Sequence, residues 1–199
     1  MTEQPASGFV FMVFHYPEPG HAEALAANMR EMGAHLTAKQ HRLGGLMDTA
    51  KIDEGHRELA ALARAGGFGT PPPGEWTAEQ VLAHVACADT AIASVALRVA
   101  AGERPAYDNR PSLDVVNLAR IIADAGDLAG LADLVEQRGE ILTAAARALS
   151  PADRAVLVPV LIVSGEQLVV DEPWSAEDLV IGVGTFHLPR HADQLAALR

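Results

Sequence analysis

The sequence predicts a mainly helical bundle that carries a small β element. Hydrophobic residues make up 49% of the 199 residues, enough for a core, and only 5% of the residues are aromatic. Alanine, leucine and valine dominate the apolar set, which favours helix packing over a β-sandwich. Residues 77–101 and 127–149 repeat apolar side chains at helical spacing, whereas residues 156–171 are β-prone.

The first 45 residues are interpreted as a separate βα extension. Phe9–Phe14 is a short apolar run that Pro17 and Pro19 end, so we expect a buried strand there, followed by a helix over residues 20–36. This order resembles the opening βα unit of the dimeric α/β-barrel family. A lone strand cannot form a sheet. It must pair with another part of the chain or with a second copy, and we expect a homodimer.

Residues 46–199 are expected to form the helical bundle itself. Leucines and alanines at helical spacing predict a helix over residues 53–65. The proline-rich segment 70–74 cannot be helical and is interpreted as a stiff linker. Thr77 and Gln80 then have the spacing of a capping box, which places the start of the next helix.

The chain between the two long helices is expected to be mostly polar loop. Residues 103–111 show no periodic pattern, so we expect a set of their side chains to face solvent or line the mouth of a pocket: Glu103, Arg104, Tyr107 and Arg110. Ser112 would cap a short helix that ends near Ile122.

The last part of the chain combines a hairpin and a helix. Residues 156–171 are β-rich and contain Ser164-Gly165-Glu166 in their middle, which predicts a β-hairpin. Ser175 and Asp178 have the spacing of a helix N-cap, so the last helix should run from there towards Leu198.

Charge and cysteine content exclude several functional classes. The net charge is −11 and the 15 basic residues are scattered, which argues against a nucleic-acid surface. The single cysteine, Cys87, excludes an internal disulfide and a cysteine-rich zinc site, and fits a reducing compartment. The longest apolar run, Ala155–Val163, is too short for a membrane helix, and Met1–Pro5 lacks the basic region of a secretory signal. We therefore expect a soluble cytoplasmic protein with no nucleic-acid or membrane partner.

Three histidines are candidate metal ligands. His187 and His191 are four residues apart, and on one helix that spacing places two imidazoles on the same face, with Cβ atoms about 5–6 Å apart. His84 falls on the apolar stripe of an earlier helix and should face the interior. Three neutral imidazoles leave at least one metal position for water or substrate, as catalytic sites do. Such donors suit zinc, nickel, iron or copper.

Pro189 stands between two of these candidate ligands. Inside a helix it removes one backbone hydrogen bond, so the helix must kink or begin nearby. If the helix began at Pro189, His187 would leave the regular face and the pair would lose its spacing. Thr185 is a candidate to cap the freed backbone.

Other residues near the three histidines have more than one interpretation. Asp89, Asp193 and Gln194 are candidate outer partners of the ligands. Cys87 could be a fourth ligand or a reactive thiol, although a small buried hydrophobe is the simpler role. Trp76 is expected to be a packing anchor at a helix start. The remaining histidines are expected at the surface: His15, His21, His35, His41 and His56.

Three segments resemble the DinB-like superfamily, which includes the mycothiol-dependent maleylpyruvate isomerases: Pro73–Val85, Val169–Pro173 and His187–His191. The resemblance covers about residues 51–199. It implies a four-helix bundle with a long crossover and a divalent metal held by His84, His187 and His191. For some members it implies transferase or isomerase chemistry with a thiol such as mycothiol or bacillithiol. The isomerase branch tends to carry Glu where His187 stands, so this chain is closer to the general three-histidine pattern.

Three functional hypotheses remain open at this point. In the first, the ion activates a small thiol that attacks an electrophile, with an acid–base partner that the sequence does not identify. In the second, the chain binds a metal ion or a small ligand without catalysis. In the third, it is a structural dimerisation bundle without metal, in which Phe9–Phe14 pairs across subunits.

Overall fold

A computed structural model describes residues 46–165 and 167–199, which are mainly helical and carry a small three-stranded sheet. The predicted fold class is confirmed at this level. The predicted extension over residues 1–45, with its strand at 9–14, lies outside the described residues.

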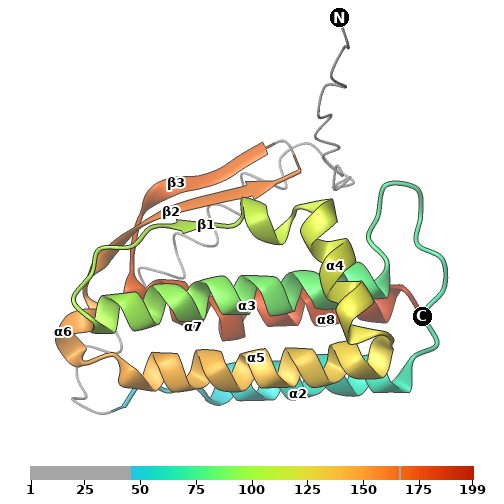
Figure 1. Cartoon of the computed structure of the whole chain (residues 1–199), viewed down its shortest axis with the longest axis horizontal. Coiled ribbons are helices and arrows are strands. Elements are labelled where there is room, and N and C mark those ends of the chain that lie inside the picture. Colours follow the sequence, from blue (N-terminus) through green and yellow to red (C-terminus); the bar gives the residue numbers. More distant parts are fainter. Residues whose placement is uncertain (1–45, 166) are drawn as a thin grey trace, which may run out of the picture.

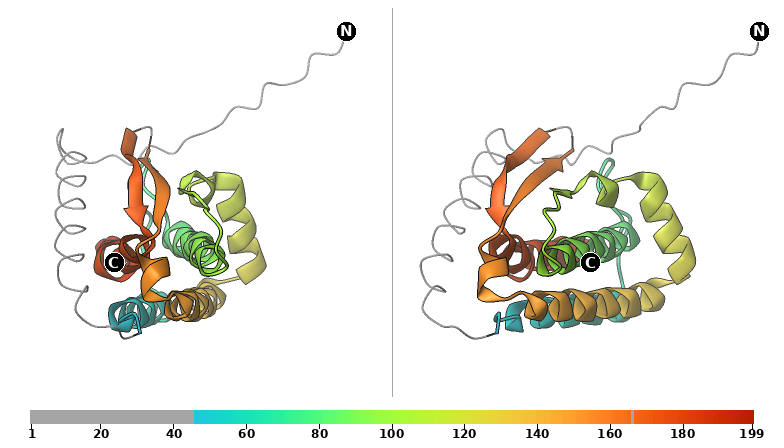
Figure 2. Two further views of the ribbon diagram at one scale, coloured as in Figure 1. Left: turned by 90° about the vertical axis from the view of Figure 1, so that its left-hand side faces the viewer. Right: turned by 60° about the vertical axis from the view of Figure 1, so that its left-hand side comes forward.

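Four long helical segments lie side by side and occupy the corners of a square when viewed along their axes (Figure 2). The last of them is composite, because a π-helical turn joins two α-helices without a break. The segments are α2 (Ala50–Ala65), α3 (Ala78–Ala100), α5 (Leu128–Ala148), and the run of α7 (Ala176–Gly182), η2 (Val183–His187) and α8 (Leu188–Ala197).

The connection from α3 to α5 crosses the length of the molecule. Both helices run in the same direction, so the chain must return before α5 can begin (Figure 1). Three short elements make that return: β1 (Tyr107–Asp108), the 3₁₀ turn η1 (Arg110–Ser112) and α4 (Val115–Ala125). This path brings β1 and η1 over the same side of α3 as the sheet.

The predicted hairpin is confirmed and extends further than expected. After the short α6 (Pro151–Arg154), strands β2 (Leu157–Ser164) and β3 (Gln167–Ser175) pair antiparallel, with an irregularity between Ile162 and Val163. β3 continues to Ser175 because Trp174 and Pro173 still find partners on β2. The sheet covers the layer formed by α3 and the last helical segment (Figure 1).

The prediction that residues 103–111 form a polar loop is wrong for Tyr107 and Asp108, which form β1. Tyr107 and Asp108 pair in parallel with β2, and Tyr107 lies opposite Val160. Residues paired across a sheet share a face, and Val160 faces the helices, so Tyr107 is buried as well. Asn109 prolongs the pairing with its side chain, which donates to the Val163 carbonyl and accepts from the Val163 N–H, each at 2.9 Å.

Two predicted helix caps are confirmed. The Thr77 side chain accepts a hydrogen bond from the N–H of Gln80, and the Gln80 side chain accepts from the N–H of Thr77, which is a complete capping box. The Ser175 hydroxyl accepts from the N–H of Asp178 at the start of α7. Both helices that supply the candidate ligands therefore begin where their sequence patterns place them.

The predicted cap of the short helix α4 is wrong. Asp114, not Ser112, caps it, because the Asp114 carboxylate accepts from the N–H groups of Val116 and Asn117. A carboxylate at a helix start also interacts favourably with the helix dipole. Ser112 lies two residues earlier, at the end of η1, where its hydroxyl donates to the Asn109 carbonyl at 2.7 Å.

The core is built around α3. Several of its side chains are fully buried between the other helices and the sheet: Val81, Leu82, Val85 and Val99. Of the helices that the structure describes, α3 alone has the length and apolar composition of a membrane span, and most of that stretch is buried inside the protein.

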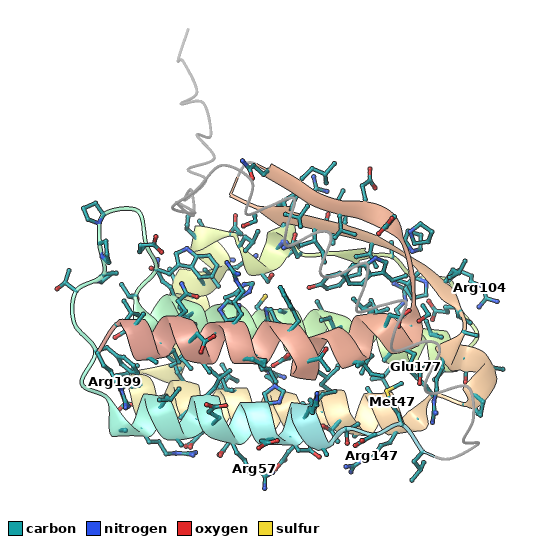
Figure 3. The ribbon with its side chains drawn as sticks, turned by 180° about the vertical axis from the view of Figure 1, so that it is seen from behind. Met47, Arg57, Arg104, Arg147, Glu177 and Arg199 are labelled. Atoms are coloured by element: carbon teal, nitrogen blue, oxygen red, sulfur yellow. The ribbon has the colours of Figure 1, made fainter. Side chains whose placement is uncertain are left out.

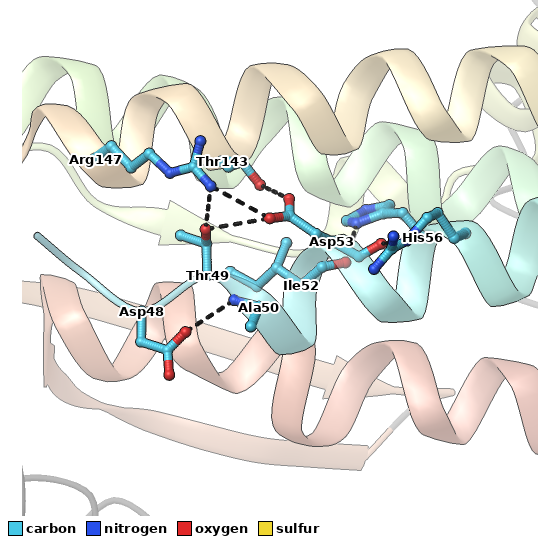
Figure 4. A network of polar contacts seen from close by, with 9 residues as sticks. Asp48, Thr49, Ala50, Ile52, Asp53, His56, Thr143 and Arg147 are labelled. Carbon is cyan, nitrogen blue, oxygen red and sulfur yellow. Dashed lines mark hydrogen bonds and ion pairs between the residues drawn. The ribbon is translucent and has the colours of Figure 1, made fainter.

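Helices α2 and α5 are joined by polar contacts at one end (Figure 4). The Asp53 carboxylate accepts a hydrogen bond from the Thr143 hydroxyl at 2.7 Å and pairs with Arg147 at 3.3 Å. Arg147 also donates to the hydroxyl of Thr49. Arg57, on the outer face of α2, points away from the bundle (Figure 3).

Candidate metal centre

The rings of His84, His187 and His191 converge from α3, η2 and α8. Their centroids are 5.1 Å (His84–His187), 4.9 Å (His84–His191) and 4.6 Å (His187–His191) apart. One nitrogen from each ring lies within 4.8 Å of the other two. The three side chains are close enough to hold one metal ion.

Hydrogen bonds to the outer nitrogens fix the orientation of two rings. Nδ1 of His84 lies 2.8 Å from the Ser112 carbonyl, which can only accept, so this nitrogen carries the proton. Nδ1 of His191 likewise donates to Oε1 of Gln194 at 3.0 Å. In both rings Nε2 keeps its lone pair, as a metal ligand requires. Gln194 thus makes the contact predicted for an outer partner.

His187 is the ring that the protein alone does not satisfy. Without an ion, its Nε2–H donates to the Nε2 lone pair of His84 at 3.0 Å. Its Nδ1 is buried and has no hydrogen-bond partner among the described residues. With the His187 proton on Nδ1 instead, the Nε2 atoms of both rings would present lone pairs, and a cation could bind both. The donor set, three neutral imidazole nitrogens, fits a divalent ion of the zinc, nickel or iron type.

The π-helical turn η2 keeps His187 beside His191 despite Pro189. Pro189 has no N–H, so the helix cannot continue with regular hydrogen bonds at that point. The N–H of Leu188 instead bonds to the carbonyl of Val183, five residues back, which widens the turn and lets the helix continue. The helix therefore does not begin anew at Pro189. The Thr185 hydroxyl donates to the Ile181 carbonyl at 2.9 Å within the same turn.

Gly184 allows this widened turn to lie against the start of α2. A Cβ at position 184 would come within 2.7 Å of the backbone nitrogen of Ile52, closer than real Cβ atoms approach. Only glycine fits there without movement of one of the two helices. This close approach restricts the position of η2, and therefore of His187, along the axis of α2.

Burial keeps all three rings neutral. Burial lowers the pKa of His84 to about 4, and the hydrogen bond to Ser112 opposes this only in part. The pKa of His191 falls to about 3, first because of burial and then because of His84 nearby. Burial, followed by His191 and His84, holds the pKa of His187 well below its ordinary value. The lone pairs are therefore available at neutral pH without competition from protons.

The three rings are hydrogen-bonded to neutral groups, although the carboxylates of Glu75 and Asp193 line the same cavity. Across residues 46–165 and 167–199, the partners of the outer nitrogens are a carbonyl and an amide, and no carboxylate bonds to the three rings. A divalent ion held here would keep its full charge. It would therefore favour an anion in its open position.

The three histidines open onto a cavity of about 700 Å³. The sheet supplies much of the opposite wall with apolar side chains: Ile162, Val163, Val169 and Trp174. Polar and charged side chains also line the cavity: Glu75, Asn109, Ser164, Thr185, Arg190, Asp193 and Gln194. A cavity of this size with a largely apolar wall and a few placed polar groups is typical of small-molecule sites. Trp76, buried as predicted, lies against His84 with ring centroids 5.0 Å apart.

The prediction that His56 lies at the surface is wrong. The ring is buried, and its Nε2 lies 2.8 Å from Oδ2 of Asp89 while its Nδ1 lies 2.7 Å from the Ile52 carbonyl. Burial alone would lower the pKa of His56, but the hydrogen bond and charge of Asp89 outweigh it and raise the pKa. Burial raises the pKa of Asp89, and His56 offsets this only in part. Asp89 is thus bonded to His56 rather than to the three-histidine cluster.

Two other candidates lie outside the centre. Cys87 is half-buried, and its Sγ lies 3.9 Å from the Pro111 carbonyl, so it does not join the group of atoms that could hold an ion. Burial raises the pKa of the Cys87 thiol, which disfavours a reactive thiolate. Asp193 lines the cavity but forms no hydrogen bond to the three rings.

A scan against protein-family models, a search of curated proteins and a search of solved structures each found no match to this chain. Its donors, its burial and the cavity beside it define the chemistry of the centre. Three neutral nitrogen donors at a cavity wall suit an ion that also binds a molecule inside the cavity.

Proposed function

We propose that this chain is a DinB-like protein that binds a divalent metal ion through His84, His187 and His191 and uses it for thiol chemistry. The observation that carries the proposal is the convergence of the three rings at the wall of a 700 Å³ cavity. The four long helical segments and the long connection between α3 and α5 support the four-helix bundle with a crossover that the resemblance implies.

The roles of the residues follow from their hydrogen bonds. His84 and His191 donate their Nδ1 protons to Ser112 and Gln194, so they present Nε2 to a common point. A divalent ion bound there would lower the pKa of a thiol or a water molecule and hold the resulting anion. The three neutral ligands leave the ion its positive charge, which favours such an anion, and the apolar sheet wall limits the water that could compete with it.

The proposed reaction class is transfer or isomerisation with a low-molecular-weight thiol of the mycothiol or bacillithiol type. The cavity volume supports a ligand of that size, because pockets of about 300–1,000 Å³ accept small organic molecules. The alternative is a module that binds a metal or small ligand without catalysis. A structural dimerisation bundle without metal is the third possibility, and it predicts that the histidines can be replaced without loss of any ligand.

Elemental analysis of untagged protein tests the metal centre. We expect about one divalent ion per chain, lost in the His84→Ala and His191→Ala variants while the helical circular dichroism is kept. Cys87→Ser is the matched control, since Cys87 lies outside the cluster, and it should keep the ion. If the wild-type protein stays metal-free after incubation with zinc, nickel and iron salts, the proposed metal centre is wrong, and a metal-free ligand-binding module or the structural bundle is left.

Thiol consumption in the presence of electrophiles then separates an enzyme from a binding module. Metal-loaded protein should accelerate transfer from a small thiol to at least one member of a panel of activated alkenes, epoxides and alkyl halides. His191→Ala should abolish the acceleration, and Cys87→Ser should not. Metal binding with no acceleration across the panel would support the binding module. Sedimentation at micromolar concentration tests the homodimer, and a monomer would contradict it.

A further inference from the structure

The cavity extends well beyond the three histidines. Its wall includes both His84 and Ile92 of α3, which are eight residues apart and therefore about 12 Å apart along the helix axis. A metal–nitrogen bond is only about 2 Å long. A molecule that fills the cavity must therefore reach far past the coordination centre, towards the end lined by β1 and the sheet.

Tyr107 stands at that end of the cavity. β1 holds it opposite Val160 with its side chain towards the helices, and Asn109 fastens the strand through its two bonds to Val163. The Tyr107 side chain lines the cavity, and no hydrogen bond joins its hydroxyl to another described residue. Buried tyrosines usually have a partner for this group. The Tyr107 hydroxyl is therefore free to bond to a ligand in the cavity.

The surroundings of Tyr107 define what it can recognise. Burial, then the negative charge of Asp89, then Cys87 and Asp108 raise its pKa, so the hydroxyl stays protonated and donates. The adjacent wall is aliphatic, so the burial of a charged acceptor there would cost more free energy than the burial of an uncharged one. Ile92, Ile162 and Val169 supply that aliphatic wall, and the Tyr107 hydroxyl is one of the few polar groups in the cavity that can orient a ligand.

We propose that Tyr107 is a specificity-determining residue that donates a hydrogen bond to a carbonyl oxygen of an elongated ligand whose other end lies at the three histidines. The acceptor is an amide, ester or ketone oxygen. This inference rests on the proposed metal centre, and it adds the ligand's length and the chemistry of its far end. A ligand without that oxygen would leave the Tyr107 hydroxyl buried and unpaired, which costs binding free energy.

The test uses two series of thiols on cobalt-loaded protein. One series is N-methyl ω-mercaptoalkanamides with two to eight methylene groups, and the other is the carbonyl-free alkanethiols of equal length. Dissociation constants are measured from the thiolate-to-cobalt absorption band. We expect the amide to bind more tightly than its matched alkanethiol at one or two chain lengths, by about 3- to 10-fold.

Tyr107→Phe should remove that preference while the alkanethiols bind as before and cobalt stoichiometry stays unchanged. Thr90→Val is the matched control: its hydroxyl bonds to the Ala86 carbonyl on α3, outside the cavity wall, and the preference should remain. Equal preference in Tyr107→Phe and wild type, or no preference at any length in wild type, overturns the role of Tyr107 while the metal centre stands. Failure of wild type to bind cobalt or any thiol overturns the proposed function and this inference together.

Discussion

The imidazole of His56 on α2 lies directly against Gly139 on α5. A Cβ at position 139 would come within 2.5 Å of Cγ of the His56 ring, and within 2.7 Å of its Nδ1. The two helices therefore pack through the His56 ring of α2 and the backbone of α5 at Gly139, which has no side chain. The same ring is held by Asp89 of α3, so one buried polar side chain connects three of the four helical segments.

Gly139→Ala should destabilise the protein by about 1–3 kcal/mol, because the added methyl group forces the ring or the helices apart. Urea unfolding followed by circular dichroism measures the change. Gly182→Ala is the matched control, since a Cβ there meets nothing within 4 Å and alanine is the better helix former. Equal effects of the two substitutions would contradict the close contact at His56.

Asp89→Ala should cost about 3–5 kcal/mol, because it leaves the buried His56 ring without its partner. The exposed pair of Arg64 and Asp133 provides the comparison, and Asp133→Ala should cost at most about 1 kcal/mol. The double variant His56→Leu/Asp89→Leu should recover part of the loss. A small effect of Asp89→Ala alone would show that the pair contributes little to folding.

The metal-free protein should lose stability in acid. The pKa of His84 is about 4 in the folded protein, against an ordinary value of 6.5. Below pH 6.5 the unfolded chain takes up a proton that the folded protein refuses until about pH 4, so stability falls across that window. At pH 5 this amounts to ~2 kcal/mol for His84 alone, and His191 acts in the same direction.

Urea titrations of metal-free wild type and His84→Gln at pH 7 and pH 5 measure this dependence. The variant should show the smaller difference between the two pH values. His56 acts with the opposite sign: its pKa is raised, so its contribution is complete below pH 6.5 and is lost as the pH rises through the folded value. An unchanged pH difference in His84→Gln would contradict the buried neutral state of this ring.

Gln194→Ala should weaken metal affinity by about 10- to 100-fold with little change in the stability of the metal-free protein. The substitution removes the acceptor that orients His191. Asp193→Ala, one residue away on the cavity wall, is the control and should bind metal like wild type. Competition with a chromogenic chelator gives both affinities, and equal losses in the two variants would contradict an orienting role for Gln194.

Pro189→Ala should weaken metal binding while it stabilises the helix itself. Alanine restores an N–H at position 189, so the widened turn of η2 can close to a regular α-helical turn. That closure would rotate His187 relative to His191. Chelator competition and urea unfolding should then move in opposite directions, and tighter metal binding in the variant would contradict the role assigned to the turn.

Local sequence patterns predicted the elements that depend on local chemistry. The Thr77–Gln80 capping box and the Ser175 cap need only neighbours three residues away, and both form. The hairpin around Gly165 was predicted from its β-prone residues and turn. Ser112 failed as a cap because Asp114, two residues on, offers a stronger acceptor to the same helix start.

Long-range pairing explains what the sequence did not show. His56 follows Ile52 by four residues and precedes Leu59 by three, so it lies on the buried stripe of α2, which was a usable signal. Its partner Asp89 is 33 residues away, and no local sequence pattern indicates that the two side chains pair. Tyr107 is buried only because β2 arrives some 50 residues later to pair with it. The three histidines were correctly grouped, but the π-helical turn that aligns two of them was not anticipated.

The 103 residues that separate His84 from His187 set the order in which the centre can assemble. A nascent chain that has emerged as far as α5 presents one of the three imidazoles, and the other two arrive together on η2 and α8. Ion capture must therefore follow the docking of the final helical segment rather than guide earlier folding. A bound ion would then crosslink the C-terminal segment to α3 after that segment has docked, and so would slow its release.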